Sequence, residues 1–209
     1  MLKNLLEKIN EEYTLKSIEN DEFSSVKISI MHCDCEIYEA KNLGHVFYMN
    51  SKAPLGLMKM ETLIINPFEL DAPLLSLELI NNKKVIFEIY NTLLEENTDS
   101  VKIQEVFNKY KEYELENTPH WYDELLLAST KTKMPNIELA KQLIDESFDA
   151  YLDVLEDSHI CDSIEKKEKA KEFVNGLLEN GGPSTDMFMK KFGLEKTEKF
   201  FNEAMFGTK

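Results

Sequence analysis

The chain has 209 residues, of which 43% are hydrophobic, and this composition suits one domain with a sizeable core. It argues against a disordered chain, a collagen-like repeat or a disulfide-rich scaffold. Asp and Glu number 39 against 24 basic residues, so the formal net charge is −15. A charge of this sign repels nucleic-acid phosphates and anionic lipid surfaces. We therefore predict one domain over residues 1–209, with neither nucleic acid nor a membrane as its partner.

All the basic residues are Lys, and the chain contains no Arg. It therefore lacks the bidentate guanidinium group that commonly holds carboxylates and phosphates, and Lys, backbone N–H groups or hydroxyls must hold any anion. The abundance of Lys, Asn and Ile is typical of an AT-rich bacterial genome. Charges interrupt the N-terminal segment, and no apolar run approaches the ~18 residues of a membrane span. With three Cys and no disulfide framework, the chain is predicted to be cytoplasmic.

The first half of the chain has the pattern of a β-sheet. An amphipathic helix is predicted over 1–14, followed by runs rich in Val, Ile, Phe and Tyr. The predicted strands cover 25–32, 35–40, 45–50, 57–66, 74–80 and 84–90. Asn42-Leu43-Gly44 and Asn81-Asn82-Lys83 have the composition of hairpin turns. Six strands without intervening helices predict an antiparallel meander.

The second half of the chain has helical periodicity. Asn97-Thr98 is a predicted cap for a helix over 99–114, and further helices are predicted over 119–128, 135–158, 162–179, 183–191 and 194–205. Pro183 suits the first turn of its helix, and Gly193 suits a helix end. A block of strands followed by helices predicts an α+β fold in which helices cover the faces of the sheet.

Metal and nucleotide motifs are weak in this sequence. Cys33 and Cys35 share one face of a predicted strand, but Cys161 is distant and no Cys-x-x-Cys spacing occurs, so we predict buried thiols and no metal site. No glycine-rich phosphate loop is present. Of the four His residues, His120 is the one of interest, because it lies in a Pro-His-Trp-Tyr cluster at a predicted helix start.

Carboxylates within apolar strands are more informative. Glu78 follows Ser76 on one face of the strand 74–80, and Glu88 lies in the next strand. Lys59 and Glu61 share a face of the preceding strand. If these faces coincide, several titratable groups line one side of the sheet, where burial raises carboxylate pKa values and prepares them to deliver protons. The alternative is a solvated face on which carboxylates are ordinary.

Several segments resemble the ferredoxin-dependent bilin reductases. ETLIINP at 61–67 and DAPLLSLEL at 71–79 resemble the hydrophobic strand, the Pro, the short loop and the second strand at the core of that family. PHWYD at 119–123, the segment 149–156, NGGPS at 180–184, and the segments 187–193 and 198–206 resemble its second half. The likeness covers roughly residues 57–206.

The resemblance implies an α/β/α sandwich with a central antiparallel sheet, and a linear tetrapyrrole between the sheet and the C-terminal helices. It implies no tightly bound cofactor or metal, single electrons from reduced ferredoxin or flavodoxin, and protons from acidic side chains to a bilin radical. Glu78 falls at the position of the catalytic Asp of the family, and Glu61 at that of a His or Asn. The second acid of the family falls on Gly182, one helical turn before Asp186, which is a candidate substitute.

These observations lead to three hypotheses. The first is an oxidoreductase of a linear tetrapyrrole such as biliverdin, with Glu78, Glu61 and Asp186 as catalytic residues. Its substrate contacts would be Lys59, Ser76, Glu88 and His120, and its electron donor would dock on a lysine patch. Two patches are candidates: Lys166, Lys167, Lys169 and Lys171, or Lys190, Lys191, Lys196 and Lys199. The second hypothesis is a tetrapyrrole-binding protein without redox turnover, and the third is an interaction protein that uses the fold as a scaffold.

Overall fold

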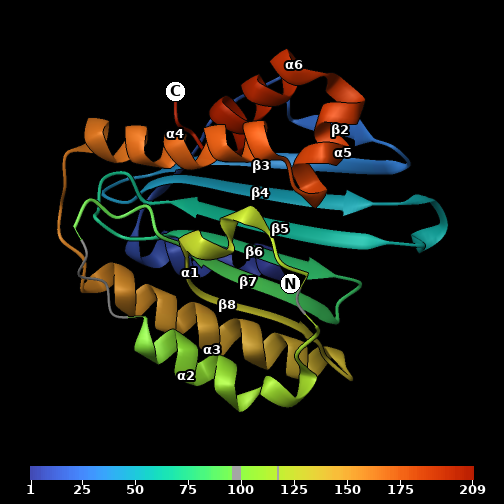
Figure 1. Ribbon diagram of the computed structural model, residues 1–209, viewed down its shortest axis with the longest axis horizontal. Helices are drawn as coiled ribbons and strands as arrows, with labels where there is room; N and C mark the ends of the chain where they lie inside the picture. The colour runs from blue at the N-terminus through green and yellow to red at the C-terminus, as the bar shows by residue number, and fades with distance from the viewer. Residues whose placement is uncertain (96–99, 117) are drawn as a thin grey trace.

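An antiparallel sheet of eight strands forms the centre of the molecule (Figure 1). The computed structural model describes residues 1–95, 100–116 and 118–209. The strands are β1 (Leu15–Ser17), β2 (Ser25–Ile28), β3 (Met31–Ala40), β4 (Gly44–Lys52), β5 (Lys59–Asn66), β6 (Leu74–Ile80), β7 (Lys84–Tyr90) and β8 (Leu126–Lys133). Their order is β1-β3-β4-β5-β6-β7-β8, and β2 also pairs with β3. The predicted meander is therefore confirmed from β3 to β7.

Both predicted hairpin turns are present. Asn42 between β3 and β4 has a φ of 63°, and Asn81 and Asn82 between β6 and β7 have φ values of 51° and 58°. Asn tolerates this left-handed conformation because its short side chain adds little steric conflict. Tight turns of this kind hold consecutive strands in register and keep the sheet antiparallel.

The helices are α1 (Leu5–Glu12), α2 (Val101–Lys109), α3 (Ile137–Glu156), α4 (Ser163–Asn180), α5 (Pro183–Phe192) and α6 (Leu194–Lys199). A π-helical turn, Phe200–Met205, continues α6. Two predicted helix starts are confirmed by caps: Asn136 Oδ1 accepts from Leu139 N at 2.8 Å, and Asp162 Oδ1 accepts from Ile164 N at 2.9 Å. None of the described helices is long and apolar enough to cross a membrane.

The structure corrects three predicted elements. The helix predicted over 119–128 is a short 3-10 turn, Trp121–Leu125, that leads into the strand β8. The backbone of β8 forms its hydrogen bonds with β7, a long-range pairing that local periodicity cannot predict. The segment predicted as one strand over 25–32 turns at Ser29, which has a φ of 54°, so that β2 and β3 form a hairpin. The strand β1 has only three residues and was not predicted. The proposed cap Asn97-Thr98 lies outside the described residues.

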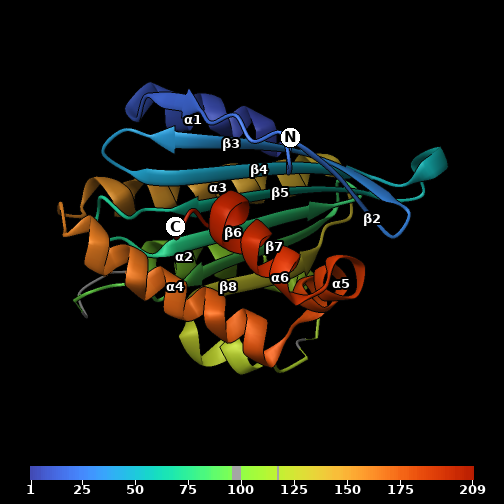
Figure 2. The same cartoon turned by 90° about the horizontal axis from the view of Figure 1, so that it is seen from above.

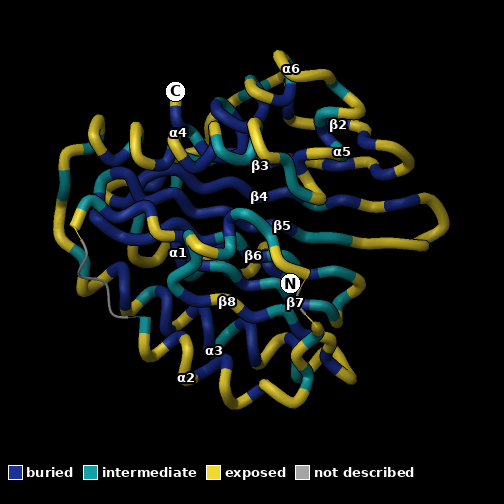
Figure 3. Tube along the Cα trace, viewed as in Figure 1, coloured by how far each residue is buried: buried dark blue, intermediate teal, exposed yellow. Residues whose placement is uncertain are grey.

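The two faces of the sheet pack against different helices (Figures 1 and 2). One face meets α1, α2 and α3 in a core that contains Leu63, Leu77 and Phe87. The other face meets α4, α5 and the π-helical turn in a second core that contains Phe47 and Phe200. Figure 3 shows the buried residues concentrated along the central strands. Alternation along each strand assigns neighbouring residues to opposite cores.

Buried polar contacts fasten the C-terminal segment to β4 and β5. The His45 ring is buried and shares a hydrogen bond of 2.7 Å with the Ala204 carbonyl, and Asn66 Nδ2 donates to the Phe206 carbonyl at 2.7 Å. Burial lowers the pKa of His45 to about 4, so the ring is neutral at pH 7. Gly207, with a φ of 61°, allows the chain to pass this ring, since a Cβ there would lie 2.4 Å from it. The last residues therefore form an integral part of the second core.

Candidate functional site

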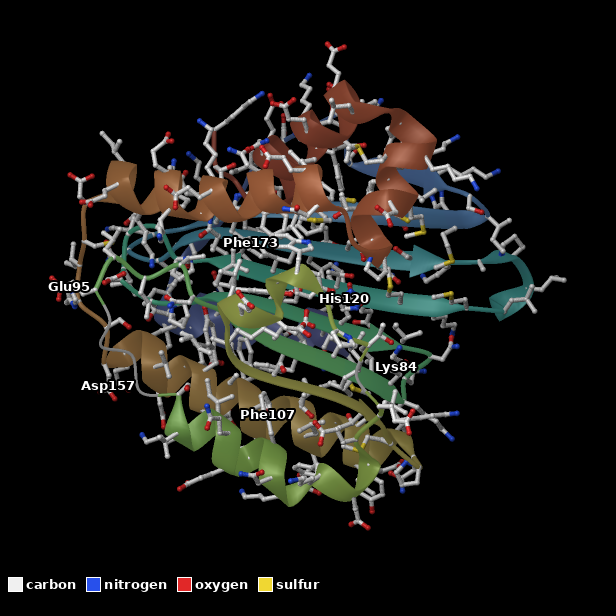
Figure 4. All side chains as sticks on the ribbon, viewed as in Figure 1. Lys84, Glu95, Phe107, His120, Asp157 and Phe173 are labelled. Atoms are coloured by element: carbon white, nitrogen blue, oxygen red, sulfur yellow. The ribbon has the colours of Figure 1, made fainter. Side chains whose placement is uncertain are left out.

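A cavity of about 640 Å³ lies between the sheet and the segment that joins α4 to α5. Its floor comes from β2 to β8. Its walls come from α4, α5 and five residues that precede β8, namely Leu115, Glu116, Thr118, His120 and Tyr122. Figure 4 labels three lining residues from different elements, Lys84, His120 and Phe173. The volume falls within the range of sites for small organic molecules. The cavity is therefore the candidate ligand site.

The strand register brings the acidic residues of β6 and β7 to the floor of this cavity. Ser76 is directly opposite Glu88, and Glu78 lies two residues further along β6. Directly opposed residues in an antiparallel pair share a face. Ser76, Glu78 and Glu88 all line the cavity. The structure therefore brings together three residues that the sequence placed on two separate strands.

Glu78 is the most strongly perturbed carboxyl group of the floor. Burial raises its pKa from the usual 4.5 to about 7, and the nearby charge of Glu88 adds to the rise. Lys84 and Lys131 act in the opposite direction through their positive charges. A carboxyl group with this pKa is partly protonated at neutral pH, which is the state that a proton donor requires.

Glu88 is held by a hydrogen bond from the neighbouring face residue of its own strand. The Tyr90 hydroxyl donates to Glu88 Oε2 at 2.8 Å. Burial raises the pKa of Glu88, and this hydrogen bond opposes the rise. Burial and the Glu88 charge in turn raise the pKa of Tyr90, so its hydroxyl keeps its proton. Glu78 and Glu88 repel each other when both are ionised, so they titrate as a coupled pair.

Aromatic rings form one wall of the cavity. The His120 ring stacks on Tyr122 with a centroid distance of 4.9 Å, and Tyr122 meets Tyr90 edge-on at 6.0 Å. Tyr90 packs against Phe173 of α4 at 4.5 Å. The His120 amide donates to Asp123 Oδ2 at 3.0 Å, which orders the start of the turn. Flat aromatic surfaces of this kind suit a planar conjugated ligand.

Trp121 joins this wall to the C-terminal helices. Its indole Nε1 donates to the Gly181 carbonyl at 2.9 Å. Its ring lies so close to α4 that a Cβ at Gly176 would be 2.5 Å from it. The Pro-His-Trp-Tyr cluster noted in the sequence therefore packs between the sheet and α4. This packing places His120 at the cavity.

Glu61 and Lys59 do not reach the cavity, which corrects the expectation that their face coincides with that of Glu78. Thr62 is opposite Glu78, so Glu61 points to the other face of the sheet. There Glu61 Oε2 accepts from the Leu2 amide at 2.8 Å and from the Tyr48 hydroxyl at 3.2 Å, and the Met1 amine lies 2.9 Å away. Glu61 therefore holds the 3-10 turn Leu2–Asn4 that leads into α1.

Asp186 also lies apart from the cavity-lining residues. It is exposed in the first turn of α5, and its Oδ1 accepts from the Gly182 amide at 3.4 Å. The side chains beside it, Thr185 and Met187, line the cavity instead. The carboxylate thus stabilises the N-terminus of its own helix.

Sequence reasoning missed several polar residues of the cavity. They include Thr62, Ser51, Lys84 and Lys131. Thr62 Oγ1 is buried without a hydrogen-bond partner among the described residues, which makes it a candidate ligand contact. Alternation along β5 predicts that Glu61 and Thr62 lie on opposite faces of the sheet. A register shifted by one residue would therefore have assigned Thr62, in place of Glu61, to the face of Glu78.

The cysteines and histidines do not form a metal centre in the described part of the chain, where no three His, Cys, Asp or Glu residues gather to hold an ion. Cys33 and Cys35 are buried on the cavity side of β3. Burial raises the pKa of Cys35 to about 12, so its thiol stays protonated. These residues act as small apolar side chains.

The first predicted lysine patch contains one buried residue. Lys166 is buried, and its Nζ donates to Asp71 Oδ1 at 3.0 Å and to the Thr92 carbonyl at 2.5 Å. Lys167 lies over the Phe68 ring at 4.1 Å. In the second patch, Lys199 pairs with Glu22 of the β1–β2 segment at 2.5 Å. Intramolecular contacts therefore engage part of each patch, whereas Lys190 and Lys191 of the second patch are exposed.

The fold and the cavity together define an α+β protein in which an antiparallel sheet and C-terminal helices enclose a ligand-sized space. No protein-family model matches the sequence, and a search of curated proteins finds no match. The structure nevertheless matches the crystal structure of phytochromobilin synthase from tomato in complex with biliverdin, with a TM-score of 0.73. The match covers 100% of this chain and 83% of that chain, at 14% sequence identity. Phytochromobilin synthase is a ferredoxin-dependent bilin reductase, so the resemblance found in the sequence is confirmed at the level of the fold.

Proposed function

We propose that this protein reduces a linear tetrapyrrole bound in the cavity, taking electrons singly from reduced ferredoxin or flavodoxin in the cytoplasm. The observation that carries the proposal is Glu78, a carboxyl group with a pKa of about 7 on the floor of a cavity of about 640 Å³. Support comes from the similarity of the fold to a protein crystallised with biliverdin. The three-layer α/β/α arrangement implied by the family resemblance belongs to the same proposal.

The proposed reaction delivers two electrons and two protons to one double bond of the pigment. The donor supplies each electron, and after each electron Glu78 donates one proton to a ring or bridge carbon of the pigment. Between the two transfers Glu78 takes up a proton from solvent, so that two electrons and two protons convert one double bond into a single bond. Glu88, which the sequence suggested as a substrate contact, becomes the acidic partner of Glu78 in place of Glu61, because its charge acts on Glu78. While Glu78 is ionised, its negative charge makes ionisation of Glu88 less favourable.

Polar groups around the floor are suited to holding the pigment. The unpartnered Thr62 hydroxyl and the Ser76 hydroxyl can hydrogen-bond to pyrrole N–H and lactam groups. Lys84 and Lys131 line the cavity and supply positive charge for acidic side groups of the pigment. The stacked rings of His120 and Tyr122 would pack against its conjugated plane.

An anaerobic absorption titration with biliverdin, followed by reduced ferredoxin, tests the proposal. We expect a spectral shift on binding and a second, product spectrum after reduction. Glu78→Gln should keep the binding shift and slow turnover by about 10²–10⁴-fold, as expected for the loss of a general acid. Glu61→Gln is the matched control, because Glu61 lies on the opposite face of the sheet. An unaffected rate in Glu78→Gln would defeat the assignment.

A second candidate function is pigment binding without reduction. It is favoured by Gly182, which stands where the resemblance places a second acid, and by the exposed Asp186, which lies outside the cavity lining. In the same titration, tight binding without a product spectrum would establish this function. Absence of any pigment binding would instead favour an interaction protein that uses the fold as a scaffold.

A further inference from the structure

Four basic side chains form a row across the end of the sheet. Lys27 is directly opposite His32, His32 is opposite Lys52, and Lys52 is opposite Lys59. We call these residues the basic row. Directly opposed residues share a face, with Cβ atoms about 4.5–5.5 Å apart. All four residues are exposed, and the row extends for about 14 Å across β2, β3, β4 and β5.

This row is electrostatically unfavourable in the isolated chain. Like charges opposite each other destabilise a sheet. His32 lies 3.2 Å from Asp34, but Lys27, Lys52 and Lys59 make no ion pair with any residue that the structure describes. The row is also unusual in a chain with a net charge of −15. The three Lys side chains of the row, which form no ion pair within the described residues, provide a favourable site for an acidic partner.

Exposed apolar side chains lie beside the basic row. Leu55, Leu57 and Met58, in the turn between β4 and β5, have 98%, 72% and 36% of their surfaces exposed, and Ile30 in the β2–β3 turn has 57% exposed. We call these four residues the apolar tip. Figures 1 and 2 show both turns at the same end of the sheet, where the β4–β5 turn projects beyond the helices. An apolar centre flanked by charge is typical of a protein-binding surface.

The same strands carry the cavity on their other face. Met31 and Met60 line the cavity, and they are the sequence neighbours of His32 and Lys59. Met58 of the apolar tip and Met60 of the cavity lining are two residues apart, which is about 7 Å along a β-strand. A protein seated on the basic row and the apolar tip is therefore close to a ligand in the cavity, separated from it by little more than the sheet backbone.

We propose that the basic row and the apolar tip together are the docking surface for an acidic one-electron donor protein. This inference rests on the proposed function, which requires electrons to enter the cavity. The rest of the chain, with its excess of carboxylates, repels an acidic donor and steers it to this end of the sheet. The surface replaces the two helical lysine patches suggested by the sequence. An acidic protein is favoured over an anionic bilayer, since a bilayer would face the same repulsion across its whole plane.

Charge reversal in the basic row tests the proposal. The variant Lys52→Glu/Lys59→Glu should raise the Kd for an acidic [2Fe–2S] ferredoxin by about 10-fold or more at low ionic strength, with a smaller effect in 0.5 M salt. The control variant Lys41→Glu/Lys141→Glu makes the same change in net charge at exposed positions outside the proposed surface. It should change the Kd by less than about 2-fold. Leu57→Ser should weaken binding without changing its salt dependence.

Calorimetry with oxidised ferredoxin and no pigment separates this proposal from the proposed function. If ferredoxin binds and the charge reversal weakens binding, the docking surface stands even when biliverdin is not reduced. If biliverdin is reduced but both double variants bind ferredoxin equally, the docking surface is overturned. Absence of ferredoxin binding also overturns it. If phosphatidylglycerol vesicles then bind, and Leu57→Ser abolishes that binding, the surface is a membrane-binding site instead. A biliverdin titration of each variant checks that the cavity is intact.

Discussion

Replacing Glu78 by Gln should remove a pH-dependent loss of stability. The folded protein binds the Glu78 proton with a pKa of about 7, whereas an exposed glutamate in the unfolded chain has a pKa near 4.5. The folded state therefore holds this proton more tightly than the unfolded chain does. The contribution to stability is complete below about pH 4.5 and is lost as the pH rises through about 7. At about 1.4 kcal/mol per pH unit, the difference corresponds to about 3 kcal/mol.

Gln has nearly the shape of protonated Glu and stays neutral at every pH. We expect the free energies of unfolding of the two proteins to agree near pH 4.5. At pH 8 the variant should be more stable than the wild type by about 3 kcal/mol. Urea unfolding followed by circular dichroism at several pH values measures this difference. Glu11→Gln, an exposed position in α1, is the control and should show no such trend. A difference between Glu78→Gln and the wild type that is the same at pH 4.5 and pH 8 would refute the reasoning.

Three further predictions concern other contacts. Tyr90→Phe removes the hydroxyl that donates to Glu88 at 2.8 Å, so the pKa of Glu88 should rise further and stability at pH 8 should fall by about 1 kcal/mol in urea unfolding. Lys166→Met leaves the buried Asp71 carboxylate without its cation and should cost about 3–5 kcal/mol. The double variant with Asp71→Asn removes the buried charge and keeps an oxygen for the Leu94 and Glu95 amides, so it should recover part of this loss; equal stability of the two variants would contradict the prediction. Glu61→Gln should cost about 1–2 kcal/mol, because it weakens the contacts that hold the turn before α1, and it should leave biliverdin binding unchanged; a loss of binding would mean that Glu61 acts in the site.

Several local features of the fold were predictable because local chemistry dictates them. The turns at Asn42 and at Asn81-Asn82 follow from the ability of Asn to adopt positive φ, and the helix starts at Asn136 and Asp162 follow from their capping oxygens. Residues 126–133 show the opposite case. Their Leu-rich start has no clear period, and only pairing with β7 makes them a strand.

The candidate site was partly predictable for the same reason. Alternation along a single strand placed Ser76 and Glu78 on one face without any tertiary information. The relation between strands was different, because it depends on which residue of one strand is opposite which residue of the next. The register pairs Thr62 with Glu78, and it sends Glu61 to the opposite core.

The sequence by itself determined the acidic and Arg-free composition, the antiparallel meander, the turns and the presence of carboxyl groups within apolar strands. Only the tertiary structure decided that Glu78 and Glu88 share a cavity floor, that Lys166 is buried beside Asp71, and that four basic residues form a row. The physical reason is the separation along the chain of the residues that set each property. Turn, cap and period are properties of a few consecutive residues, whereas pKa values, buried ion pairs and cross-strand rows depend on distances between residues far apart in the chain.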